Sequence, residues 1–246
     1  MVASYEDIGS NLIRGICGQV DGSVIPGMIG LEAGQSGFGD IYAWFRRILE
    51  FPLKELLPDE DLADALSEKI IPALTARAEK IPVEESTLIA TDWMNGRRTP
   101  DANQLLKGAI AGITLGTSAP HIFKALVEAT AFGSRAIVER FRSQGVRIDN
   151  VIGIGGIALK SPFVMQTLSD VLNMPIEVCR TDQACALGAA MFAATAAGLY
   201  TKVEEAQQAM NSGFAMTYSP RKEMVRAYDK AYKQYLELGR YCESTT

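Results

Sequence analysis

The sequence predicts an α/β fold in which a mixed sheet is flanked by helices. Three observations lead to this: an opening pair of apolar runs joined by a turn signal, a later alternation of strand-like and helix-like segments, and a long closing amphipathic segment. Antiparallel strands followed by alternating strands and helices are typical of such a sheet. No repeat, low-complexity tract or long linker divides the chain, so we expect one domain over residues 1–246.

The first expected element is a hairpin over Asn11–Leu31. Asp21 and Gly22 lie between its two apolar-rich runs. This dipeptide favours a two-residue type I′ turn, because both positions need a positive φ. We therefore expect two antiparallel strands that meet at Asp21-Gly22.

A glycine-rich junction then leads into helices. Gly34, Gly37 and Gly39 precede apolar residues that recur at helical spacing from Ile41 to Ile48. A further helix is predicted over residues 58–80. Its expected apolar stripe consists of Leu62, Leu66, Ile70 and Leu74.

Residues 87–104 are predicted to form a short strand and a turn rich in Asn, Gly and Pro. Asp92, Arg97 and Arg98 lie within seven residues of one another in that turn. Loops that carry such groups often carry function. A solvated ion pair is an equally good explanation.

The second half of the chain alternates helices and strands. A long helix over Pro120–Arg142 leads into a strand that begins at Val151. The elements expected after it are a helix from near Ser161, a strand over Ile176–Cys179, a small-residue helix within Ala184–Tyr200 and a closing helix over Arg221–Arg240. The uncharged run at Ala184–Tyr200 is short and weakly apolar for a membrane span, so we expect a closely packed interior helix.

Paired glycines, Gly155 and Gly156, stand between the strand at Val151 and the next helix. Glycine lets backbone amides approach a phosphate or a flat ring without an intervening Cβ. A tight strand-to-helix turn explains the same pair without any ligand. This stretch alone does not separate the two explanations.

Composition narrows the classes of partner. The net charge is -5 and no cluster of Lys and Arg stands out, which argues against nucleic acid as a partner. The four cysteines are widely spaced, without a C-x-x-C pair or a leader segment ahead of them, so we expect buried thiols in a cytoplasmic protein. The single histidine, His121, is expected in the first turn of a helix rather than in catalysis.

Four stretches, taken together and in order, resemble the C-terminal half of the FGGY carbohydrate kinases, in their ribulokinase branch. The stretches are "GICGQVDGSVIPGMIGLEAGQSGFGDIYAWF", "DWMNGRRTPDANQ", "GGIALKSPFVMQTLSDVLNMPIEV" and "DQACALGAAMFAA". The likeness runs from about Gly15 to about Gly198 and continues weakly to the end. It implies a ribonuclease-H-like domain of the actin, hexokinase and Hsp70 type. It also implies ATP-dependent phosphorylation, with Mg²⁺, of L-ribulose or a related pentulose to the 5-phosphate.

The resemblance also assigns roles on the nucleotide side of the kinase. It implies that Gly155 and Gly156 meet the adenosine and that Lys160 and Ser161 line the purine pocket. Many relatives carry a polar residue such as Asn in the segment that holds Lys160 and Ser161, so a direct bond from these two to the base does not follow.

The resemblance also implies roles for residues of the first glycine-rich junction and of the turn after the short strand. The resemblance implies that Gly34 and Gln35 face the phosphates and ribose, and that Glu32 contacts sugar hydroxyls. Three residues, Asp92, Asn95 and Arg97, match a loop that would shape the cleft.

Three functional parts of the family are absent from these 246 residues: a phosphate loop of the first domain, the general-base Asp and a Gly-Thr phosphate loop. Asp21 is expected in a turn and Asp40 at the start of a helix, so neither is a convincing base. Phosphoryl transfer needs a group that accepts the hydroxyl proton. We therefore expect no catalytic residue in this chain, an absent sugar-binding domain and no turnover by the chain alone.

The resemblance also places the hairpin at strands two and three of the fold, so the first strand is expected to be missing. Unpaired strand edges are normally paired or covered. We expect residues Val2–Ile8 to fill the gap, or two copies to exchange strands in a homodimer. The alternative is a sheet split in two and a poorly stable product.

Two other classes of function compete with a kinase half. One is a non-enzymatic, actin-like assembly module. The other is a dinucleotide-binding domain, although "GIGGIA" lacks the G-x-G-x-x-G pattern and its acidic partner, for which Glu177 is the nearest residue.

Overall fold

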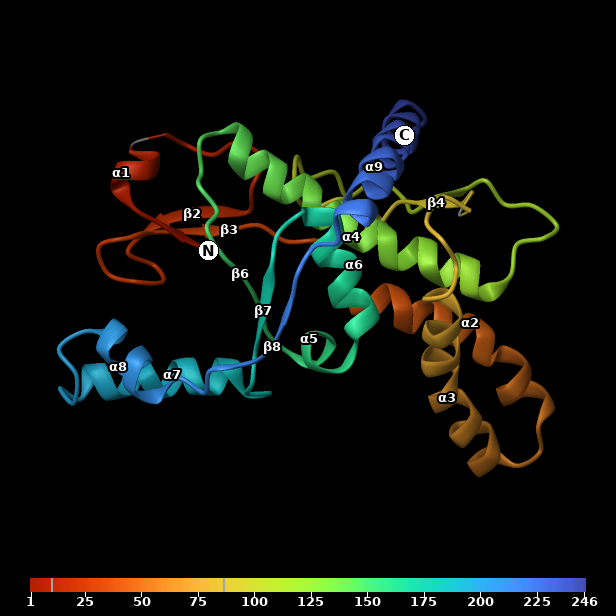
Figure 1. The fold of residues 1–246 in the computed structure, drawn as a ribbon, viewed down its shortest axis with the longest axis horizontal. Helices are drawn as coiled ribbons and strands as arrows, with labels where there is room; N and C mark the ends of the chain where they lie inside the picture. The colour runs from red at the N-terminus through yellow and green to blue at the C-terminus, as the bar shows by residue number, and fades with distance from the viewer. Residues whose placement is uncertain (10, 86) are drawn as a thin grey trace.

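The computed structural model describes residues 1–9, 11–85 and 87–246, and Figure 1 shows its helices and strands. The chain opens with β1 (Val2–Ala3) and the short helix α1 (Tyr5–Ile8), followed by β2 (Gly18–Asp21) and β3 (Ile29–Glu32). These strands form an antiparallel sheet in the order β1-β3-β2. The N-terminal residues therefore do supply a third strand.

That third strand does not join the hairpin to the later parallel strands. β1 lies at the edge of its sheet, and β6, β7 and β8 form a separate sheet. The expected mixed sheet is thus divided into small sheets that helices flank. β4 (Ile89–Ala90) and β5 (Ile110–Ala111) form a further antiparallel pair.

The hairpin is confirmed, but its two-residue turn is wrong. Asp21 pairs with Ile29, so residues 22–28 form the connection. Pro26 has no amide hydrogen for a ladder bond, which disfavours a second strand that runs through residue 26 and closes a two-residue turn at Asp21-Gly22. The chain instead turns at Ile25–Met28, where Gly27 has a φ of 78° and the Met28 amide donates to the Ile25 carbonyl.

Two helices, α2 (Gly39–Leu56) and α3 (Glu60–Ala78), pack against each other and project from the rest of the molecule in Figure 1. The side chain of Asp59 caps α3 by accepting a hydrogen bond from the Leu62 amide. The predicted leucine stripe is wrong at its start, because Leu62 is exposed. The buried side is one step away and uses smaller residues: Ala63, Ser67, Leu74 and Ala78.

The central helix is α4 (Ala119–Ser143), which packs on α2, α3, α6, α9 and β4. Its first turn is capped by Ser118 and His121, whose side chains lie 2.7 Å apart, so His121 lies in the predicted turn. Every residue from Phe123 to Gly133 is buried. The sequence pattern predicted one buried face, whereas this stretch is covered on all sides.

The second sheet carries the paired glycines at its edge. After β6 (Val151–Gly153) come α5 (Gly156–Lys160), α6 (Pro162–Leu172) and β7 (Ile176–Cys179). β6 and β7 are parallel, while β8 (Phe214–Tyr218), which sequence reasoning missed, is antiparallel to β7. This sheet is therefore mixed, as expected for the fold.

The small-residue helix is not an interior helix. α7 (Ala184–Ala196) packs mainly on α8 (Val203–Met210), and Figure 1 shows the two helices projecting away from α4 and α6. Met191 is the buried residue of α7, whereas Phe192 is 46% exposed and Leu199, just beyond the helix, is 74% exposed. Its small apolar residues lack the neighbouring elements that would bury them.

The closing helix, α9 (Lys222–Ser244), confirms the last predicted element. Its tyrosines Tyr228, Tyr232 and Tyr235 are buried around Phe132 of α4, with ring centroids 5.5–6.2 Å apart. Aromatic pairs at such separations add to the stabilisation from area burial.

The expectation of buried cysteines is wrong, because none of the four is fully buried. All four are free thiols, but Cys17 and Cys185 are exposed, while Cys179 and Cys242 are partly buried. Cys17 lies beside the start of β2 and Cys185 on the uncovered helix α7, where few neighbouring elements cover them. Among the described residues, no helix is both long and apolar enough to cross a bilayer.

Candidate functional site

Two glycine-rich junctions, each between a strand and a helix, lie against each other. The first is the glycine segment, residues 33–38, between β3 and α2; the second is the β6–α5 junction at Ile154 and Gly155. Ile157 of α5 reaches Gly39 at the start of α2, where an added Cβ would lie 2.6 Å from Ile157 Cδ1. Glycine at 39 therefore lets the Ile157 side chain lie directly against the start of α2.

The paired glycines expose their backbone. Gly155 has a φ of 87°, a conformation that favours glycine, so the turn accounts for this residue. A Cβ added at Gly155 or Gly156 would meet no described heavy atom within 4 Å. The turn therefore leaves room for a ligand to approach the backbone.

Lys160 and Ser161 follow at the α5–α6 boundary. Lys160 is exposed at the end of α5, and Ser161 is half-buried. The Ser161 carbonyl accepts a hydrogen bond from the Met165 amide at 3.1 Å, and α6 begins at the next residue, as predicted.

The side chain of Gln35 points into the protein. Its Nε2 donates to Asp92 Oδ2 at 2.8 Å and to the Thr130 carbonyl at 2.9 Å, and its Oε1 accepts from the Ser134 hydroxyl at 2.9 Å. The amide group is therefore already bonded at both ends. Only the backbone of Gln35 is left to face a ligand.

Glu32 and Gly34 contact the loop that follows β4. Arg98 Nη2 donates to Glu32 Oε1 at 2.8 Å, and the Glu32 side chain remains 66% exposed. The Gly34 amide donates to Thr99 Oγ1 at 3.3 Å. The structure thus brings Glu32, Gly34 and Gln35 together with residues of one loop.

Asp92 is a buried carboxyl at the start of that loop. It accepts from Gln35 and, through Oδ1, from the Tyr235 hydroxyl at 2.7 Å. Burial raises the pKa of Asp92 above its usual range, and the hydrogen bonds from Gln35 and Tyr235 oppose that rise. The interpretation of Asp92 as a member of a solvated ion pair is wrong for this residue.

Sequence reasoning missed the residues that surround Asp92. Gly133 of α4 leaves the space for it, because an added Cβ would lie 2.3 Å from Asp92 Oδ2 and 2.4 Å from Gln35 Nε2. An isolated glycine inside a helical pattern signals a packing or functional requirement. Tyr235 gave no such signal, since its partner is 143 residues away.

A separate apolar groove of about 660 Å³ lies between β6, β7, α7 and α8. Its lining includes Ile152, Ile154, Leu187, Gly188 and Met191. Ile152 and Ile154 are 52% and 55% exposed. Sequence reasoning did not find this groove, because the expected burial of α7 would have closed it.

The two aspartates that were rejected as bases lie where expected or close to it. Asp21 is exposed at the end of β2, and Asp40 is exposed in the first turn of α2. Within residues 1–9, 11–85 and 87–246, no three His, Cys, Asp or Glu side chains form a group that could hold a metal ion.

Sequence comparison gives a consistent family. Residues 2–197 match the model of the FGGY family of carbohydrate kinases, C-terminal domain. A ribulokinase of Vibrio parahaemolyticus is 48% identical over 99% of this chain and 44% of its own length. A ribulokinase of Bacillus licheniformis is 40% identical over 96% of this chain and 42% of its own length. The chain thus spans less than half the length of these curated relatives.

Solved structures share the fold. A xylulose kinase from Rhodospirillum rubrum has a TM-score of 0.72 at 20% identity, covering 89% of this chain and 41% of that one. A Plasmodium falciparum glycerol kinase with ADP has a TM-score of 0.61 at 22% identity, covering 85% of this chain and 39% of that one. These likenesses show the ribonuclease-H-like fold of the kinases. The chain therefore belongs to the FGGY family of carbohydrate kinases and corresponds to its C-terminal domain.

Proposed function

We propose that this chain is the nucleotide-binding half of a kinase that transfers a phosphoryl group from ATP to L-ribulose, or a related pentulose, forming the 5-phosphate. The observation that carries the proposal is the meeting of the two glycine-rich junctions in a chain of this family. The 48% identity to a ribulokinase supports the choice of substrate. Residues 1–246 would form one domain of the whole kinase, in the cytoplasm.

The nucleotide would lie over the paired glycines. Open space at Gly155 and Gly156 would let backbone amides reach it, and Lys160 and Ser161, at the α5–α6 boundary, would line the purine pocket. Gly34 and the backbone of Gln35 would face the phosphates and ribose. Mg²⁺ is commonly held by substrate phosphates with one or two carboxylates. A preformed cluster of acidic residues is therefore not required.

Glu32 would contact the hydroxyl groups of the sugar. Its carboxylate is exposed at the end of β3 and retains acceptor capacity beside Arg98. A general base must lie within about 2.6–3.2 Å of the hydroxyl proton that it removes. Asp21 lies exposed at the end of β2, and Asp40 lies exposed in the first turn of α2. We propose that neither is the general base and that the chain is inactive by itself.

The nucleotide site can be tested on the chain by titration with ADP in a calorimeter. Gly156→Val places a branched side chain over the glycine pair and should abolish binding while the circular dichroism spectrum is unchanged. Gly188→Val on α7 is the matched control, because an added Cβ there also meets no described atom within 4 Å. If Gly188→Val abolishes binding and Gly156→Val does not, the nucleotide lies in the apolar groove and the placement is wrong.

The sugar contact requires an active enzyme, so it is tested in a polypeptide that also carries the sugar-binding domain. Glu32→Ala should raise the KM for L-ribulose more than the KM for ATP, because of the two substrates only the sugar would contact the lost carboxylate. Equal changes in the two KM values would mean that Glu32 is structural.

A second candidate function is assembly of the chain with a copy of itself. The uncovered apolar residues Ile152, Ile154 and Phe192 favour it, because exposed apolar surface of this kind marks interaction sites. We propose that the isolated chain forms a homodimer through this face. The sedimentation experiment described below tests it.

A further inference from the structure

The loop after β4 contacts the glycine segment and its flanking residue at three points. We call residues 92–101 the clamp loop. Its members Asp92, Arg98 and Thr99 bond to Gln35, Glu32 and Gly34, at 2.8, 2.8 and 3.3 Å respectively. These three contacts restrain both the backbone and the side chains of the segment.

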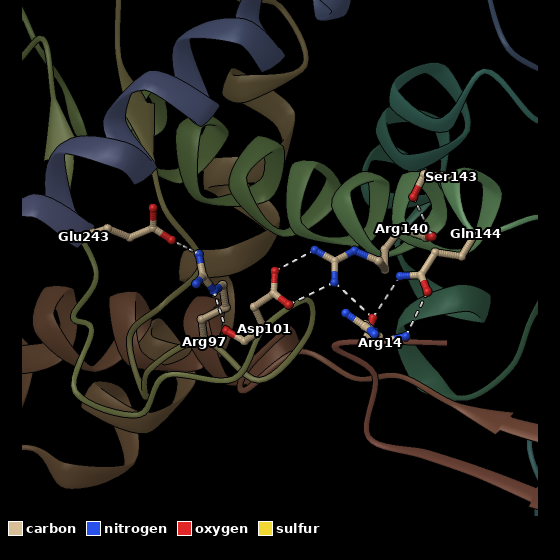
Figure 2. A network of polar contacts seen from close by, with 7 residues as sticks. All are labelled: Arg14, Arg97, Asp101, Arg140, Ser143, Gln144 and Glu243. Carbon is tan, nitrogen blue, oxygen red and sulfur yellow. Dashed lines mark hydrogen bonds and ion pairs between the residues drawn. The ribbon is translucent and has the colours of Figure 1, made fainter. Parts of the chain in front are cut away.

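The far side of the clamp loop is fastened to two long helices. Tyr235 of α9 donates to Asp92 at 2.7 Å, and Arg97 pairs with Glu243, also on α9. Figure 2 shows the outer end, where Arg140 of α4 donates two hydrogen bonds to Asp101, at 2.9 and 2.5 Å. The loop therefore connects the glycine segment to α4 and α9.

Glycines in those helices provide the space that the contacts need. Gly133 lies within α4, where glycine is intrinsically less favourable than alanine. A Cβ at this position would overlap with both Asp92 Oδ2 and Gln35 Nε2. Gly239 of α9 likewise lies against the ring of Trp93, 2.8 Å from an added Cβ. The helices thus have gaps that accommodate the clamp loop.

We propose that the clamp loop positions the glycine segment for nucleotide binding, and that Asp92 is the positioning residue, acting through Gln35. A loop held in its binding conformation before the ligand arrives loses less entropy on binding. Gln35 turns its amide inward to Asp92, so the segment is held from behind, and Gly39, the residue that follows it, lies against Ile157 of α5. At the front, Arg98 holds the carboxylate of Glu32. This inference rests on the proposed nucleotide site.

The test combines hydrogen exchange of the amides of residues 33–38 with the Kd for ADP, both measured on the 246-residue chain. Gly133→Ala should displace the Asp92–Gln35 pair. Loss of this buried hydrogen bond should accelerate exchange of these amides, and raise Kd, by about ten- to hundredfold. Gly188→Ala, in an open position of α7, is the matched control and should change neither quantity.

A double-mutant cycle separates positioning from general destabilisation. Asp92→Ala and Gln35→Ala should each accelerate exchange of residues 33–38, and the double variant should show no further acceleration, because both single changes break the same contact. Additive effects would overturn the role of Asp92 through Gln35. Arg98→Gln, at a half-exposed side chain, is the variant that does not threaten folding and should accelerate exchange at residues 33 and 34.

Hydrogen exchange and the Kd for ADP test different parts of the proposal. If the parent chain does not bind ADP, the proposed nucleotide site fails, while the exchange data still decide whether the loop restrains the segment. If exchange accelerates in Gly133→Ala but its Kd for ADP equals that of the parent, the positioning role is wrong. If neither quantity changes, the clamp itself is wrong.

Discussion

The helices α4 and α7 are both rich in small and apolar residues, yet their environments are opposite. In α4 every residue from Phe123 to Gly133 is buried, including Lys124 and Glu128. In α7 the buried residue is Met191. The difference follows from their neighbours, because α4 is surrounded by α2, α3, α6, α9 and β4, whereas α7 packs mainly on α8. Apolar composition indicates that a helix needs other elements packed against it. It does not say whether this chain supplies those elements.

A matched pair of phenylalanines gives the largest expected difference. Phe132→Ala on α4 removes a ring that is 1% exposed and contacts three tyrosines, so it should lower the free energy of unfolding by about 3–5 kcal/mol. Phe192→Ala on α7 should lower it by less than about 1 kcal/mol, because the ring is 46% exposed. Urea unfolding at a dilution where the chain is monomeric measures both. Equal losses would mean that α7 is as well packed as α4.

The buried ion pair of α4 gives the next effect. Lys124 Nζ lies 2.9 Å from Glu128 Oε1, and both side chains are 3% exposed. Lys124→Met should destabilise the fold by about 3 kcal/mol at neutral pH, because a buried carboxylate loses its partner.

The deficit of Lys124→Met should depend on pH. Burial raises the pKa of Glu128, so its carboxyl binds a proton more readily in the folded than in the unfolded state. The contribution of Glu128 to stability therefore falls as the pH rises from its pKa in the unfolded chain through its pKa in the folded chain. Removing Lys124 strengthens this trend. The deficit should shrink as the pH is lowered. A deficit that does not change with pH would mean that Glu128 stays neutral throughout.

The exposed pair at the end of the clamp loop should show the opposite pH dependence with a smaller size. Arg140 lowers the pKa of Asp101, so the stability from this pair is present above the unfolded pKa and is lost as the pH falls through the folded pKa. Asp101→Asn should cost no more than about 1 kcal/mol at pH 7, because the carboxylate is 57% exposed. Parent and variant should converge in acid, as measured by urea unfolding at a series of pH values.

Phe192→Ser on α7 should have the smallest effect on the stability of the monomer and the largest effect on dimer formation. Phe192→Ser should change the free energy of unfolding of the monomer by about 0.5 kcal/mol or less, because the ring is largely exposed. If a second copy covers α7, sedimentation velocity should show the parent as a dimer and the variant as a monomer at the same concentration. A parent that remains monomeric at high concentration would refute the homodimer.

Much of the local structure was predictable. Gly39 and the spacing from Ile41 to Ile48 predicted α2, and Ser118 with His121 marked the start of α4. The resemblance assigned Gly34 and Gln35 to the nucleotide and Glu32 to the sugar, and these roles stay predictions; the contacts of all three with the loop after β4 were found only in the structure. The turn at Asp21-Gly22 was not predictable from the dipeptide alone, because Pro26 moved the chain reversal to Ile25–Met28.

The sequence by itself determined the periodic helices, the strands that begin at Val151 and Ile176 and the glycine turn at Gly155, because these depend on local sterics and on residue spacing. The tertiary structure decided which apolar surfaces are covered and which polar groups meet. Asp92 and Tyr235 are 143 residues apart, and the space for Asp92 is made by Gly133 on a third element. Such contacts depend on how helices pack, and no short-range pattern records that. The same reason explains why α7, apolar throughout, was expected in the core and lies outside it.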